Sequence, residues 1–103
     1  MNIDIDLCLP YREYENRHKI FDALLDNIED GMTFTLTPSN IATGDHFLIF
    51  SAYKKQTITI HTDNVPYWID FDGDEPMLLE NCPTSFFRTL LININEGNYT
   101  IKR

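Results

Sequence analysis

Residues 83–103 read PTSFFRTLLININEGNYTIKR, and their conformation decides whether the chain contains one helix or two. Apolar side chains recur at positions i, i+1, i+4, i+5 and i+8, a spacing that places them on one face of a helix. Pro83 suits the start of that helix, and Gly97 suits its end. The β-branched ININ and the EGN turn before YTIK also suit a hairpin. We favour the helix, whose apolar face consists of Phe86, Phe87, Leu90, Leu91 and Ile94.

Residues 11–31, YREYENRHKIFDALLDNIEDG, predict another helix. At about 100° per residue, its apolar residues and one arginine gather on a single side. Gly31 stands where a glycine commonly ends a helix. The residues predicted to share this face are Tyr14, Arg17, Phe21, Leu24, Leu25 and Ile28.

Several shorter runs alternate between apolar and polar residues, or are apolar throughout, as strands are. A polar KKQ turn predicts a hairpin of residues 46–53 with 57–62, and the DGDEP turn predicts another of 67–71 with 77–81. We therefore expect an α+β fold in a single compact domain, residues 1–103: an antiparallel sheet of about five to six strands with two helices packed on one face. The predicted strands are 2–9, 32–38, 46–53, 57–62, 67–71, the short run 77–81 and YTIK at 99–102.

The charge balance limits which partners the protein can bind. Sixteen acidic residues face eight Lys and Arg, giving a net charge of −8. Such a field repels phosphate and attracts basic surfaces. Basic residues occur only in the pairs Lys54-Lys55 and Lys102-Arg103, so we expect no direct binding of nucleic acid.

Cysteine usage and the N-terminus indicate the compartment. Cys8 and Cys82 match no zinc-binding spacing, and the first residues lack the Lys or Arg of a signal peptide. No stretch approaches the roughly 20 apolar residues of a membrane helix. We expect a cytoplasmic protein with no membrane association and two reduced, buried thiols; a disulfide between them is the alternative.

The stretch DFDGDEP, beginning at Asp70, resembles part of a calcium-binding EF-hand loop. Asp70, Asp72 and Asp74 have the spacing of its first three ligands. Glu75 occupies the position that requires glycine, and Asn81 occupies that of the bidentate glutamate. A hairpin turn with outward acids is therefore the favoured interpretation, and we expect no metal there.

Four acids crowd the C-terminal half of the first predicted helix: Asp22, Asp26, Glu29 and Asp30. The helix dipole is negative at this end, so each exposed acid costs about 0.3–1 kcal/mol at low salt. Asp22 and Asp26 lie one turn apart, about 6 Å along the axis, which is comparable with the spacing of phosphates along a nucleic-acid strand. A charge arrangement that opposes stability indicates a function.

Catalytic and metal-binding motifs are absent from the sequence. His18, His46 and His61 share no HxxxH or HxH spacing, and no cysteine or serine lies in a nucleophile signature. The glycines are too dispersed for a phosphate or dinucleotide loop. We expect no enzyme, no cofactor and no metal.

Small size, acidity and the lack of catalytic motifs resemble, in type and without a shared motif, the inhibitors that phages and mobile elements use, such as anti-CRISPR proteins and DNA mimics. The resemblance predicts a viral-type inhibitor that acts through protein–protein interaction, docking negative surface on a basic, nucleic-acid-handling protein. Trp68 would be an anchor, because tryptophan is enriched at binding hot spots. The predicted acidic contacts are Asp22, Asp26, Glu29, Asp30, Asp70, Asp72, Asp74 and Glu75.

Two alternatives remain. One is a structural or assembly module that homodimerises through a sheet edge or an apolar patch. The other is a small enzyme whose site assembles from dispersed residues. The sequence leaves open whether the protein is a monomer or a homodimer.

Overall fold

A computed structural model describes residues 13–42, 55–72 and 75–102, with side chains from Arg17 onward. The predicted strands 2–9 and 46–53 lie outside these residues. The elements in chain order are α1 (Glu13–Leu25), β1 (Met32–Leu36), β2 (Gln56–His61), β3 (Trp68–Phe71), β4 (Met77–Leu78), the 3-10 helix η4 (Leu79–Asn81), α2 (Thr84–Asn95) and β5 (Thr100–Ile101).

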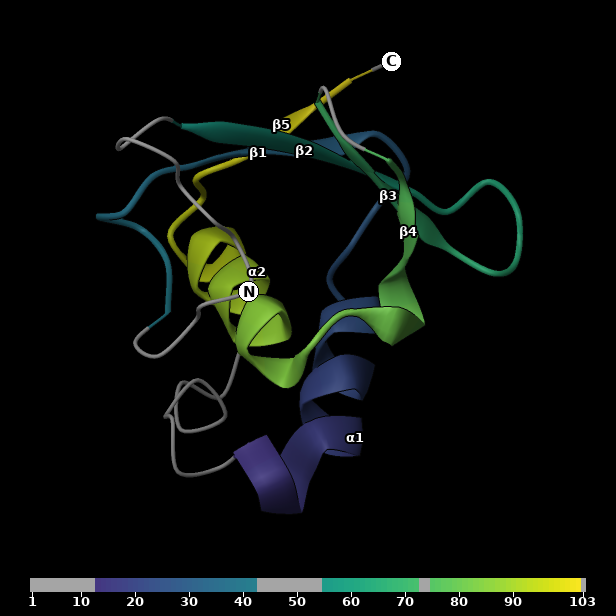
Figure 1. Ribbon diagram of the computed structural model, residues 1–103, viewed down its shortest axis with the longest axis vertical. Helices are drawn as coiled ribbons and strands as arrows, with labels where there is room; N and C mark the ends of the chain where they lie inside the picture. Colours follow the sequence, from purple (N-terminus) through teal and green to yellow (C-terminus); the bar gives the residue numbers. More distant parts are fainter. Residues whose placement is uncertain (1–12, 43–54, 73–74, 103) are drawn as a thin grey trace.

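The strands form one antiparallel sheet in the order β4-β3-β2-β1-β5. Both helices lie on the same side of it (Figure 1). The predicted α+β class is therefore confirmed, with five strands in the described part of the chain. The predicted pairing across the DGDEP turn is also confirmed, because Trp68 of β3 lies opposite Leu78 of β4.

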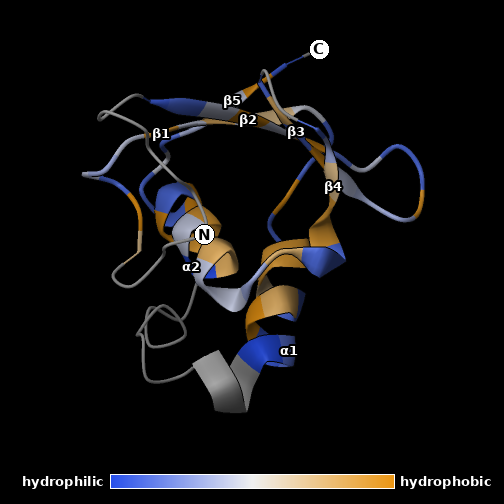
Figure 2. Ribbon diagram, viewed as in Figure 1, coloured by the Kyte–Doolittle hydropathy of each residue, from blue (hydrophilic) through white to orange (hydrophobic). Residues whose placement is uncertain are grey.

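Alternation along the three longest strands gives the sheet two different faces. The face toward the helices is apolar and buried, and Figure 2 shows hydrophobic residues of α1 and α2 beneath it. The outer face carries threonines and Asp70, with Thr33 and Thr59 hydrogen-bonded across β1 and β2 at 3.1 Å. The inner face consists of Phe34, Leu36, Ile58, Ile60, Ile69 and Phe71.

Residues 84–95 form the favoured helix, α2, and almost every one of its side chains is buried. Two of its polar residues are hydrogen-bonded to backbone groups: Thr89 Oγ1 accepts a hydrogen bond from the amide of Ala42 at 2.9 Å, and Asn93 donates to the carbonyl of Asn40 at 2.9 Å. Gly97 ends the helix with φ 73°, as predicted. The amide of Asn98 closes this end by donating to the Asn93 carbonyl at 2.8 Å.

Arg17 ties α1 to the segment that enters α2. Its guanidinium donates to Thr84 Oγ1 at 2.7 Å and to the Cys82 carbonyl at 2.9 Å. It also lies over the ring of Phe87, 4.9 Å from the centroid. Arg17 is exposed, yet these contacts link α1 to the start of α2.

The predicted end of the first helix was wrong. α1 ends at Leu25, where the side-chain amide of Asn27 donates to the Ala23 carbonyl at 2.7 Å and terminates the hydrogen-bond ladder. The acids beyond it oppose a longer helix, because they would face the negative end of the dipole. Gly31 therefore does not cap the helix.

Gly31 instead joins the sheet strands. Its amide donates to the Ile60 carbonyl at 2.8 Å, and its carbonyl accepts from the Lys102 amide at 2.7 Å. The residue has φ 83°, and a Cβ atom added there would overlap the Lys102 carbonyl oxygen. Both the backbone angle and the contact require glycine.

Gly31→Ala should therefore lower the free energy of unfolding by about 2–4 kcal/mol, from left-handed strain plus the steric overlap. Gly97→Ala is the matched control, because Gly97 has φ 73° but nothing within 4 Å of an added Cβ. It should cost only about 1–2 kcal/mol. Urea denaturation measures both values, and equal losses would contradict the steric role of Lys102.

Candidate functional site

The α1 acids present carboxylates to solvent. Asp22 lies on the helix and Asp26 just after it, and both are exposed. No basic residue occupies the last turn of α1, and neither carboxylate forms a salt bridge within the described ranges. These two predicted residues therefore carry negative charge that the fold does not neutralise.

Glu29 and Asp30 do not lie on the helix face where the sequence predicted them. They belong to the connection between α1 and β1, because the helix ends at Leu25. The Glu29 carbonyl accepts from the Met32 amide at 3.1 Å. Asp30 Oδ1 accepts from the Thr62 amide at 2.7 Å, so Asp30 is tied to the end of β2.

The other predicted acids lie away from α1. Asp70 projects from the outer face of the sheet, and α1 covers the inner face. Asp72 and Glu75 are exposed on either side of the β3–β4 turn, while Asp74 lies outside the described residues. The sheet therefore separates Asp70 from Asp22 and Asp26, while Asp72 and Glu75 lie beside the β3–β4 turn.

Trp68 is half-buried and is not an isolated surface anchor. It lies opposite His61 in the β2–β3 register, and the two rings stack with centroids 4.0 Å apart and planes 11° from parallel. This contact holds the imidazole in place on the outer face of the sheet.

His61 brings together residues that the sequence analysis did not connect. One potential ligand atom from each of Asp30, His61 and Asp63 lies within 4.8 Å of the other two. The Nε2 atom of His61 is buried and has no hydrogen-bond partner among the described residues. An unsatisfied buried nitrogen costs about 1–3 kcal/mol. The sequence did not indicate this cluster, because Asp30 is distant from His61 and Asp63 along the chain and the three residues match no short metal-binding spacing.

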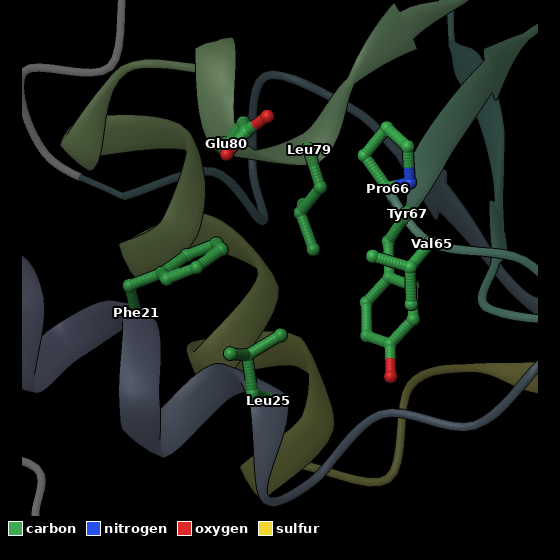
Figure 3. Close-up of a pocket in the computed structure, with 7 residues that line it drawn as sticks. All are labelled: Phe21, Leu25, Val65, Pro66, Tyr67, Leu79 and Glu80. Carbon is green, nitrogen blue, oxygen red and sulfur yellow. The ribbon is translucent and has the colours of Figure 1, made fainter.

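An apolar cleft of about 290 Å³ lies beside α1. Figure 3 shows Phe21 and Leu25 of α1 on one side, and Val65, Pro66 and Tyr67 from the β2–β3 loop on the other. Val65 is 87% exposed, which is unusual for a large apolar side chain. The loop residues follow no periodic pattern, so the sequence could not indicate the cleft. Leu79 and Glu80 complete its lining.

Asp22 and Asp26 each follow a cleft-lining residue directly in the chain, Phe21 and Leu25 respectively. The two acids are therefore chain neighbours of the cleft lining, Asp22 on the helix and Asp26 directly after its end. This side of the molecule, which we call the α1 docking face, combines Asp22, Asp26 and the apolar cleft.

Cys82 is buried, as predicted, and lies beside Arg17. Burial raises the pKa of its thiol from 9.0 to about 12, and the Arg17 charge opposes that rise only partly. The thiol is therefore protonated at neutral pH and is a poor nucleophile.

Comparison of the chain with protein-family models, with curated proteins and with solved structures finds no match. Neither described helix has the length and apolar character needed to cross a membrane.

In a Cys8→Ser variant, Cys82 is the sole thiol and should react slowly with a disulfide reagent such as DTNB at pH 8. A pKa of about 12 in place of 9.0 lowers the thiolate fraction about a thousandfold. We expect the native protein to react at least about a hundredfold more slowly than the same variant in denaturing urea. Similar rates in both conditions would show that the thiol is neither buried nor protonated.

Proposed function

We propose that this protein is a non-enzymatic, acidic binding protein that docks its α1 face on a basic, nucleic-acid-handling protein and blocks that protein's nucleic-acid site. One observation carries the proposal: Asp22 and Asp26, whose exposed carboxylates form no salt bridge with any described residue, each directly follow a residue that lines an apolar cleft. A basic segment with an apolar side chain would satisfy both features at once.

The charges and the cleft would supply different parts of the binding energy. Exposed ion pairs contribute only about 0.2–1 kcal/mol each, so the carboxylates mainly accelerate and orient association. Burying one large apolar side chain contributes about 1.5–3 kcal/mol. Trp68 was the predicted anchor, but its ring stacks on His61. The cleft would therefore provide the anchor instead.

The net charge of −8 favours a basic partner over nucleic acid itself. A basic groove that holds phosphates would attract the carboxylates on this rigid segment in their place. Asp70, on the outer face of the sheet, and Asp72 and Glu75, beside the β3–β4 turn, would strengthen the field without touching this partner.

Homodimerisation through a sheet edge is less favoured. The edge strands of the described sheet, β4 and β5, have only two residues each. Short edges present few unpaired backbone groups to a second copy.

Asp22→Lys with Asp26→Lys should abolish partner capture while raising stability. A lysine at this end of the helix interacts favourably with the helix dipole, and each should raise the free energy of unfolding by about 0.3–1 kcal/mol. Lost binding would then not be a consequence of unfolding. The measurement is quantitative affinity capture from a lysate of the native host, with thermal unfolding of each bait.

Asp70→Lys with Asp72→Lys is the matched control, with the same charge change at the end of β3, away from α1. It should retain most of the capture. Added duplex DNA should release the captured protein, since both would compete for one basic site. Capture that is unaffected by reversal at Asp22 and Asp26, or by DNA, would contradict the proposal.

Val65→Asp should weaken the same interaction at least about tenfold, because it places an uncompensated charge in the apolar cleft. The side chain is 87% exposed, so the substitution should leave stability nearly unchanged. Asn64→Asp adds the same charge at the neighbouring exposed position, outside the cleft lining. Equal effects of the two variants on dissociation constants would exclude the cleft as an anchor.

A further inference from the structure

We propose that Asp30, His61 and Asp63 bind a divalent transition-metal ion, and that Zn²⁺ is the best match to their donor atoms. The three potential ligand atoms lie within 4.8 Å of one another. One imidazole nitrogen with two carboxylate oxygens is a donor set that zinc uses, whereas Mg²⁺ and Ca²⁺ prefer oxygen ligands alone. The site shares no residue with the α1 docking face and does not depend on the proposed function.

The fold positions Asp30 before any ion binds. Its Oδ1 atom accepts from the Thr62 amide at 2.7 Å, and the adjacent Gly31 amide donates to the Ile60 carbonyl at 2.8 Å. These bonds hold the α1–β1 connection against the end of β2. A carboxylate has about four acceptor positions, so one hydrogen bond leaves Asp30 able to ligate.

Stacking on a neighbouring ring orients His61. Its ring stacks on Trp68 at 4.0 Å, and its Nε2 atom is buried with no hydrogen-bond partner in the described part of the chain. Either ring nitrogen of a neutral imidazole can bind a metal. The imidazole is thus held in place, and its Nε2 atom forms no hydrogen bond with any described residue.

Binding would require only a small local adjustment. With metal–ligand bonds of about 2.1 Å, ligand atoms in a tetrahedral site lie about 3.4 Å apart. Asp63 is exposed on the β2–β3 loop, so rotation of its side chain can bring its carboxylate closer. A cation would also relieve the repulsion between Asp30 and Asp63, and water would complete its coordination.

Trp68 provides a built-in measurement, because it is the sole tryptophan in the chain and stacks on His61. Titration of the protein alone with ZnCl₂ should give a saturable change in tryptophan fluorescence, and isothermal titration calorimetry should give one ion per chain. A Cys8→Ser background removes a thiol that would compete for zinc. No partner protein is needed, so this test and the docking test can fail separately.

His61→Gln and Asp63→Asn should each weaken zinc binding at least about tenfold, since even indirect contacts to a metal ligand contribute that much. His18→Gln and Asp70→Asn make the same chemical changes at exposed positions outside the cluster, and should bind zinc as the parent does. Calorimetry decides, because His61→Gln alters the tryptophan signal directly. Absence of saturable binding, equal binding by all variants, or loss in only one of the two cluster variants would overturn the site.

Discussion

The burial of α2 on almost every side is the constraint on which the rest of the structure depends. A buried polar group without a hydrogen-bond partner is costly, and Thr89 and Asn93 find their partners in backbone groups of the segment after β1. At the entry to α2, Arg17 similarly occupies Thr84 and the Cys82 carbonyl. Apolar burial supplies the main driving force, while these polar contacts fix where the surrounding segments lie.

That placement determines which parts of α1 remain available. Arg17 anchors the helix over Phe87, and one turn later Phe21 packs near the same ring, with centroids 5.0 Å apart. Beyond these contacts, the β2–β3 loop lies across from Leu25 and leaves the cleft between them (Figure 3). The acids on the same segment then face solvent, because the core takes its apolar neighbours.

Local patterns predicted elements better than their contacts. Apolar spacing identified α2, and Gly97 ended it as expected. Gly31 was likewise predicted to end a helix, yet its requirement for glycine comes from Ile60 and Lys102, which are distant in the chain. Glu29 and Asp30 were predicted to lie on the first helix, because a helical wheel considers residue spacing alone. It does not take into account the hydrogen bond by which the Asn27 side chain caps the helix end. The long-range groupings, the cleft and the His61 cluster, carried no periodic signal.

The β2–β3 loop connects the two proposals. Its first part contributes Asp63 to the His61 cluster, and its next residues, Val65 to Tyr67, line the cleft. An ion that held Asp63 would restrict the same loop that a docking partner must contact. Ordering a loop costs conformational entropy, and whichever ligand binds first would bear that cost for the other. Metal and partner would therefore favour each other's binding, provided that the bound loop keeps the cleft open.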